Sequence, residues 1–152
     1  MILSLEPRTS FDRITEFIYL GSRIGSLDDF HRLRAHGVRA CVDMKREGPD
    51  PWSFEAFLWL PTADQHAPDP LHLRIGIAFL RQCERARMPV VVLCMAGVGR
   101  SSSLVLAYLL ASSHRGHAPE EALAFLCARR ACVNPSPEQI AAAAEAARRF
   151  EV

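Results

Sequence analysis

The chain contains 152 residues, of which 49% are hydrophobic and 23% charged, and its formal net charge is +1. This length and composition predict one folded domain over residues 1–152 with its own core, and they argue against disorder. A net charge near zero disfavours an extended nucleic-acid or membrane-binding surface, so an anionic ligand should bind at a local site. No apolar run reaches the roughly 20 residues that span a bilayer, and the N-terminus does not resemble an export signal. We therefore expect a cytoplasmic protein without nucleic-acid or membrane partners.

The first half of the chain predicts three strands and one helix. Apolar runs bounded by turn residues indicate strands at 14–21, 38–44 and 56–60. Between the first two strands, a helix is expected to begin after the N-cap residue Ser26 and to end at Gly37. Segment 45–52 contains a glycine and two prolines, which is typical of an exposed loop.

The second half of the chain predicts one further strand and four helices. Helices are expected at 71–87, at 101–113, from about Pro119 onward, and from Ser136 to Phe150. The β-branched run 90–93 suits a strand buried on both faces, and helix 101–113 is apolar on nearly all sides. This order of elements predicts an α/β fold with a central, mostly parallel sheet of four to five strands flanked by helices.

The most informative segment is 90–103, which reads VVVLCMAGVGRSSS. A strand, a short loop with two glycines and a helix place successive backbone N–H groups around one point, at the positive end of the helix dipole. The loop glycines, Gly97 and Gly99, let the backbone turn and approach a ligand. The spacing Cys94-x5-Arg100 adds a thiol at the base of this cradle and a guanidinium that can hold two oxygens of a phosphoryl group. Such surroundings favour a reactive thiolate.

The sequence CMAGVGRSS after VVVL resembles the phosphate loop of the cysteine-based protein tyrosine phosphatases, and the chain length matches their small dual-specificity branch. The resemblance extends over about 14–140, including ITEFIYLGS as an opening strand. Low-molecular-weight phosphatases fit poorly because Cys94 lies late in the chain. Rhodanese domains also fit poorly because they lack the A-G-x-G-R-S series.

This resemblance implies a fold and a set of roles. Cys94 would be the nucleophile, Arg100 would hold the phosphoryl group, and Ser101 would stabilise the departing thiolate. The phosphate would be bound by the loop residues Met95, Ala96, Gly97, Val98, Gly99 and Arg100. Neither a metal nor another cofactor is required by such chemistry.

The family also uses a general acid about thirty residues before the cysteine, shortly after a proline. Asp64, three residues after Pro61, fits this pattern best. Asp69 is the alternative, although its position suits an N-cap of the following helix. The implied activity is hydrolysis of phosphomonoesters, first phosphotyrosine and second phosphoserine or phosphothreonine, in a phosphorylated protein or a small substrate. A neutral loop without lysine disfavours phosphoinositides.

One departure from the family concerns the residue before the cysteine, which is usually histidine and here is Leu93. In the family this histidine orients the loop and supports the thiolate. Its absence motivates an alternative function, that of a pseudophosphatase that binds a phosphorylated partner without efficient turnover.

Other candidates have simpler interpretations. Gln139 could position the hydrolytic water, as a glutamine in this region does in some members of the family that the chain resembles. Its capping-box spacing with Ser136 also explains its presence. The remaining cysteines are expected to be small buried residues, with Cys41 the first choice for a redox partner of Cys94. Four basic residues are expected to be solvated charges, although Arg46 or Arg130 could attract a phosphorylated substrate: Lys45, Arg46, Arg129 and Arg130.

Overall fold

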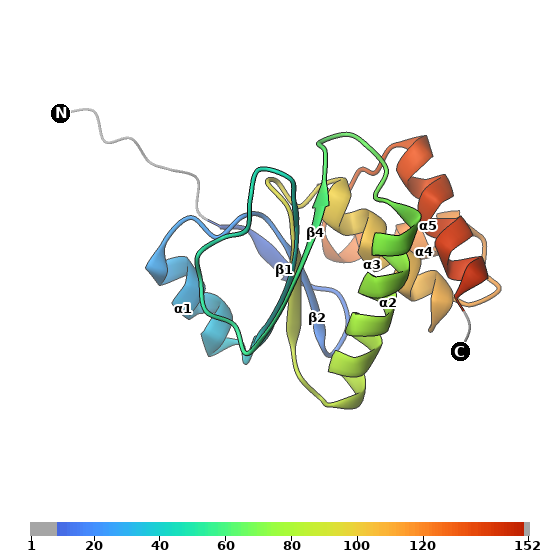
Figure 1. Cartoon of the computed structure of the whole chain (residues 1–152). Helices are drawn as coiled ribbons and strands as arrows, with labels where there is room; N and C mark the ends of the chain where they lie inside the picture. The colour runs from blue at the N-terminus through green and yellow to red at the C-terminus, as the bar shows by residue number, and fades with distance from the viewer. Residues whose placement is uncertain (1–8, 151–152) are drawn as a thin grey trace.

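The computed structural model describes residues 9–150, which form a five-stranded sheet with helices on both faces (Figure 1). The strands are β1 (Phe11–Arg13), β2 (Ile18–Gly21), β3 (Ala40–Lys45), β4 (Ala56–Thr62) and β5 (Val90–Leu93). Their order across the sheet is β1-β2-β5-β3-β4, in which the first pair is antiparallel and the other three pairs are parallel. The predicted α/β class and mostly parallel sheet are therefore confirmed.

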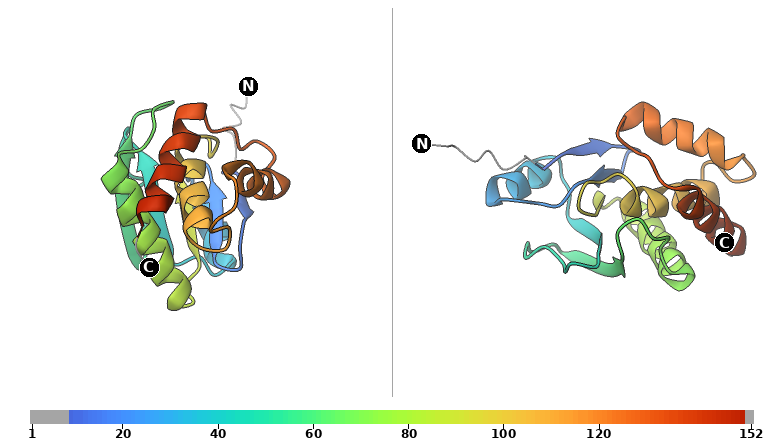
Figure 2. Two further views of the ribbon diagram at one scale, coloured as in Figure 1. Left: turned by 90° about the vertical axis from the view of Figure 1, so that its right-hand side faces the viewer. Right: turned by 90° about the horizontal axis from the view of Figure 1, so that it is seen from above.

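The helices divide unequally between the two faces of the sheet. They are α1 (Leu27–Ala35), α2 (Pro70–Arg85), α3 (Arg100–Ala111), α4 (Pro119–Arg129) and α5 (Pro137–Arg149). Helix α1 covers one face, and the other four helices lie on the opposite side, as the views in Figures 1 and 2 agree. Each face has its own apolar cluster, and the larger one lies under α2 to α5. Within residues 9–150, no helix combines the length and apolar character needed to cross a membrane.

Helix α3 occupies the centre of the larger layer, as its apolar sequence predicts. Every residue from Arg100 to Ala111 is buried. Gly76 of α2 permits this close packing, because a Cβ at that position would lie 2.5 Å from Leu104 Cδ1. Helix α3 is therefore fixed by packing along its whole length, including its first turn, which contains Arg100 and Ser101.

The N-terminal strand differs from its prediction. Residues 14–17 form the turn of a β1–β2 hairpin instead of the beginning of a strand. The hydroxyl of Thr15 accepts hydrogen bonds from the backbone N–H groups of Phe17 and Ile18, and Ile14 N donates to Ile18 O at 2.8 Å. These local bonds compete with strand pairing, and a threonine side chain in a turn commonly makes them.

Two further boundaries shift for identifiable reasons. Strand β3 begins at Ala40 because Val38 N donates to Leu33 O and completes the end of α1. Strand β4 continues through Pro61 to Thr62, two residues beyond its predicted end. A proline is tolerated there because β4 is an edge strand, so the missing N–H need not pair.

Candidate active site

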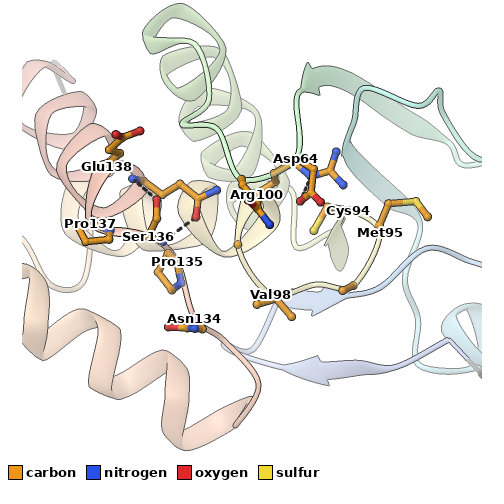
Figure 3. Close-up of a pocket in the computed structure, with 14 residues that line it drawn as sticks. Asp64, Cys94, Met95, Val98, Arg100, Asn134, Pro135, Ser136, Pro137 and Glu138 are labelled. Carbon is orange, nitrogen blue, oxygen red and sulfur yellow. Dashed lines mark hydrogen bonds and ion pairs between the residues drawn. The ribbon is translucent and has the colours of Figure 1, made fainter.

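The candidate site lies at the carboxyl ends of the parallel strands. The predicted residues Cys94 and Asp64 follow β5 and β4, and Glu47, which was not predicted, follows β3. This edge borders a pocket of about 780 Å³, whose walls are the loop after β5, residues 64–65 and the segment 134–139. Figure 3 shows Asp64 and Arg100 beside Cys94, with the first turn of α5 on the far side of the pocket from Met95. Ligands of α/β proteins commonly bind at this edge of the sheet.

The loop 95–99, here called the phosphate loop, has all five carbonyl groups turned toward donors outside the loop. Met95 O accepts from Arg23 N, Val98 O from Asn134 N at 3.0 Å, and Gly99 O from Ser103 Oγ at 2.7 Å. The carbonyls of the remaining two loop residues, Ala96 and Gly97, both accept from the guanidinium of Arg130. Within residues 9–150, the amides of this loop donate no hydrogen bond, so these donors remain available to an anion.

Gly97 is required at the tightest point of this loop. Its φ of +68° lies in the left-handed region, and a Cβ there would lie 2.6 Å from the backbone of Gly21. A side chain would therefore be strained and would push the loop away from β2. For Gly97, this agrees with the predicted need for the backbone to turn.

Arg130 is the guanidinium behind the loop, and the prediction that it is a solvated charge is wrong. It is 2% exposed, and it donates from Nε to Gly97 O at 2.9 Å and from Nη2 to Ala96 O at 3.0 Å. Its Nη1 reaches Ser10 Oγ and Asp12 Oδ2, both at 2.8 Å. The sequence carries no local signal for this role, because Arg130 lies at the end of α4, 33 residues from Gly97.

Cys94 lies at the base of the phosphate loop and is 3% exposed. Its Sγ is 3.1 Å from Ser101 Oγ, in the first turn of α3. The two neighbouring serines brace the loop instead, since Ser102 Oγ donates to Val98 O at 2.7 Å and Ser103 Oγ to Gly99 O. Of the three serines, Ser101 alone faces the thiol, as its predicted role requires.

Arg100 is buried to 1% exposure and is only partly satisfied. Its Nη1 donates to both carboxylate oxygens of Glu47 at 3.0 Å and to Thr62 O at 2.9 Å. Its Nε–H has no hydrogen-bond partner within residues 9–150, and it lies 3.8 Å from Asp64 Oδ1. A buried charged donor without a partner is costly, so this atom is the point where an acceptor from a ligand would be most stabilising.

Glu47 was not predicted as a site residue. Burial raises its pKa, but a backbone hydrogen bond and Arg100 outweigh this, so the net pKa of Glu47 is lowered. Its carboxylate therefore stays ionised as the pH falls toward the ordinary glutamate range, and its ion pair with Arg100 persists. The loop sequence contains no motif that would have singled it out.

The loop that carries Glu47 is anchored by a buried charge, which corrects a second prediction. Lys45 is 3% exposed, with Nζ 2.6 Å from Asp43 Oδ2 and 3.1 Å from Asp50 Oδ1. Burial raises the pKa of Asp43, and the hydrogen bonds and charge of Lys45 oppose that shift. Lys45 is therefore a structural residue and not a solvated charge.

The two candidate acids are separated by their positions. Asp64 lies in the turn 63–66 with its side chain 73% exposed, next to Arg100 in the pocket. Asp69 caps α2, where its Oδ1 accepts from Leu71 N at 2.8 Å. The pocket is lined by Asp64 and not by Asp69.

Leu93 and the other cysteines lie in apolar surroundings. Leu93 is fully buried in the smaller cluster, on the α1 side of the sheet, together with Cys41. Burial raises the pKa of Cys41 well above its ordinary value. Cys94 belongs to the larger apolar cluster, so the two cysteines lie in different clusters. Cys83 is buried as predicted, whereas Cys132 is exposed, contrary to prediction.

Comparison with known proteins agrees with this geometry. Residues 18–149 match the family described as "Dual specificity phosphatase, catalytic domain". The chain is 28% identical over 128 residues to tyrosine-protein phosphatase vhp-1 of Caenorhabditis elegans, covering 81% of this chain and 19% of that protein. It is 35% identical over 81 residues to human dual specificity protein phosphatase 22, covering 53% of this chain and 43% of that protein. The chain thus spans less than half the length of these two relatives.

Among solved structures, PTPMT1 in complex with PI(5)P has the same fold, with a TM-score of 0.78 and 24% identity over 91% of this chain and 94% of that one. The family match covers most of the chain, and the phosphate loop lies inside it. The chain therefore belongs to the dual specificity phosphatases, through their catalytic domain.

Proposed function

We propose that this protein hydrolyses phosphomonoesters through a phosphocysteine at Cys94. The observation that carries this proposal is the buried Nε–H of Arg100, which has no hydrogen-bond partner within residues 9–150. Arg100 lies beside Cys94 in the pocket (Figure 3). Four of the five phosphate-loop residues line the same pocket, and the loop amides have no acceptor among the described residues. Together they offer the donors that a phosphoryl group needs in both its ground and transition states.

In the first step, the thiolate of Cys94 attacks phosphorus and the bond from phosphorus to the leaving oxygen breaks. Asp64, as the carboxylic acid, gives its proton to that oxygen. Arg100 and the loop amides hold the equatorial oxygens, and Glu47 keeps the guanidinium in place through its two hydrogen bonds. The products of this step are an alcohol or phenol and the phosphocysteine.

In the second step, a water molecule attacks phosphorus while the Asp64 carboxylate takes its proton. The phosphorus–sulfur bond breaks and the electron pair returns to Cys94 as thiolate. Ser101 Oγ, 3.1 Å from the sulfur, donates a hydrogen bond to that thiolate. Neither step draws on a metal ion or a second substrate besides water.

The favoured substrate is a phosphorylated protein, with phosphotyrosine preferred to phosphoserine or phosphothreonine. The pocket wall contributes Arg100 as a cation, together with Asp64 and Glu138, so a second phosphate would meet carboxylates. The phosphoinositide bound by the PTPMT1 neighbour is therefore the less favoured substrate class here. A cytoplasmic location remains a prediction of the sequence.

The test is turnover of aryl phosphates by the purified protein. Cys94→Ser should abolish turnover but retain binding of inorganic phosphate, because the loop and Arg100 form the cradle without the thiol. Asp64→Asn should slow aryl phosphates with poor leaving groups by about 10²-fold or more, and good leaving groups far less. Asp69→Asn is the matched control, and the acid is misassigned if Asp69→Asn alone shows this selectivity.

A second candidate function, phosphoprotein binding without efficient turnover, is favoured by Leu93. This side chain cannot donate a hydrogen bond to the phosphate loop, and it lies fully buried among apolar residues. The two functions separate in Leu93→His. If the wild type is only a binding module, this variant should gain turnover, whereas a competent enzyme should show at most a modest gain and faster alkylation of Cys94 at mildly acidic pH.

A further inference from the structure

Gln139 connects three segments that border the pocket. It is 2% exposed, and its Oε1 accepts from Ser136 N at 2.9 Å, which completes the capping box of α5. Its Nε2 donates to His66 O at 3.0 Å, in the turn that follows β4. The side chain also packs on the phosphate loop, because a Cβ at Gly99 would lie 2.9 Å from Gln139 Oε1.

The turn that Gln139 reaches is the one that carries Asp64. It is closed by His66 N donating to Ala63 O at 3.1 Å, and Gln65 adopts φ +64°, which is unfavourable for a residue other than glycine. Within residues 9–150, two polar contacts from elsewhere reach residues 63–66: the bond from Gln139 and the 3.8 Å approach of Arg100 to Asp64. A strained, exposed turn with so few contacts depends strongly on each of them.

Helix capping accounts for the amide oxygen of Gln139 and not for its amide nitrogen. The capping box uses the oxygen, and a glutamate would supply that oxygen equally well. The bond to His66 O needs the amide nitrogen, because a carboxylate has no hydrogen to donate. The identity of the residue as glutamine is therefore tied to the acid-bearing turn.

We propose that Gln139 is a positioning residue that holds turn 63–66 against the phosphate loop and so keeps Asp64 within reach of the leaving oxygen. This inference rests on the proposed function, in which Asp64 is the general acid. It differs from the use of Gln139 to orient water, because its oxygen is engaged by Ser136 and its nitrogen by His66. A small displacement of a proton donor is enough to reduce the rate strongly.

The experiment compares two variants with opposite effects on the cap. Gln139→Glu keeps an acceptor for Ser136 N and loses the donor to His66 O. Ser136→Ala loses the hydroxyl that accepts from Gln139 N at 3.1 Å and keeps the bond to His66. Both are measured on a series of aryl phosphates with leaving groups from good to poor, and thermal unfolding confirms that each is folded.

Gln139→Glu should lower kcat/KM for poor leaving groups by about 10-fold more than for good ones. The added charge weakens binding of every substrate alike, so the ratio between leaving groups cancels it. Ser136→Ala should leave that ratio within about 2-fold of the wild type. In an Asp64→Asn background, Gln139→Glu should cause no further selective loss, because the group that it positions is gone.

The inference is overturned if Gln139→Glu lowers kcat/KM equally for all leaving groups, or if Ser136→Ala shows the same selectivity for poor leaving groups. These outcomes are distinct from failure of the proposed function. If Asp64→Asn is itself insensitive to the leaving group, the acid assignment falls and this inference falls with it. A selective Asp64→Asn with an unselective Gln139→Glu rejects this inference alone.

Discussion

Two arginines, Arg100 and Arg130, are among the largest fully buried side chains of the described residues. Arg130 donates to carbonyls of the phosphate loop, and Arg100 follows that loop and lines the pocket. Arg130 uses all three guanidinium nitrogens, with partners at 2.8 to 3.0 Å. Arg100 places one nitrogen on Glu47 and Thr62 and leaves its Nε–H without a partner in the described part of the chain. The same side chain therefore serves structure at one position and is available to a ligand at the other.

This difference shows that the role of a buried arginine can be inferred from the hydrogen-bond partners of its guanidinium. A buried guanidinium whose three nitrogens all donate to protein groups has little remaining capacity for a ligand, so its removal should affect stability first. A buried guanidinium with an unpaired donor facing a pocket carries an unmet hydrogen bond, and its removal should affect binding and rate first. The same substitution, arginine to lysine, can be made at both positions and compared directly.

Arg100→Lys should have the largest effect on activity. An ammonium cannot reproduce the planar fork that holds two oxygens, so kcat/KM for an aryl phosphate should fall by about 10³-fold. Steady-state kinetics and denaturant unfolding measure the two properties together. The comparison breaks if this variant loses more stability than activity.

Arg130→Lys should have the opposite balance. The carbonyls of Ala96 and Gly97 lose their donors, and the free energy of unfolding should fall by about 3 kcal/mol, at about 1 to 3 kcal/mol for each unsatisfied group. Activity should fall by only about 10-fold, because Arg100 and Cys94 remain. A loss of rate equal to that of Arg100→Lys, at unchanged stability, would contradict a structural role for Arg130.

Ser102→Ala should have an intermediate effect on stability. Its hydroxyl donates to Val98 O at 2.7 Å, but that carbonyl also accepts from Asn134 N. The expected loss is therefore about 1 kcal/mol of unfolding free energy, with kcat/KM within about 3-fold of the wild type. Urea unfolding checks the first value, and a loss as large as that of Arg130→Lys would show that the loop depends on this hydroxyl alone.

Asp12→Asn should have the smallest effect. The Asp12 side chain is 44% exposed, and its ion pair with Arg130 at 2.8 Å is accessible to solvent, so screening limits its value to less than about 1 kcal/mol. An asparagine oxygen can still accept from Arg130. A large destabilisation would mean that the charge on Asp12, and not the pair of loop carbonyls, determines the position of Arg130.

The sequence predicts much of the fold because the relevant signals are local. Ser26, Asp69 and Ser136 each cap a helix, and the run 90–93 forms β5 with its predicted bounds. The sequence does not predict the N-terminal hairpin, because β1 depends on pairing with β2. The apolar pattern of the segment that contains Thr15 also resembles that of a strand, although Thr15 makes turn bonds.

For the site, the sequence places Cys94, Arg100, Ser101 and Asp64 together because their spacing fits a known motif. In the structure Cys94, Arg100 and Asp64 line one pocket, and Ser101 lies behind the thiol. The sequence does not predict Glu47, which contacts Arg100 from 53 residues away, or Arg130, which contacts Gly97 from 33 residues away. Long-range contacts of this kind leave no periodic or spacing signal in one sequence. Gln139 has a local signal, the capping box, which conceals its second contact.

The central claim is that the Nε–H of Arg100 has no partner among the described residues and can bind the phosphoryl group, whereas the Nε–H of Arg130 is bound to Gly97 O. The most direct measurement is the NMR signal of each arginine Nε–H in Cys94→Ser during titration with inorganic phosphate, with assignments from Arg100→Lys and Arg130→Lys. The Arg100 signal should move strongly and saturably, because its Nε–H acquires an acceptor, and the Arg130 signal should stay in place, because Gly97 O already occupies it. An Arg130 signal that moves while that of Arg100 does not would contradict the account.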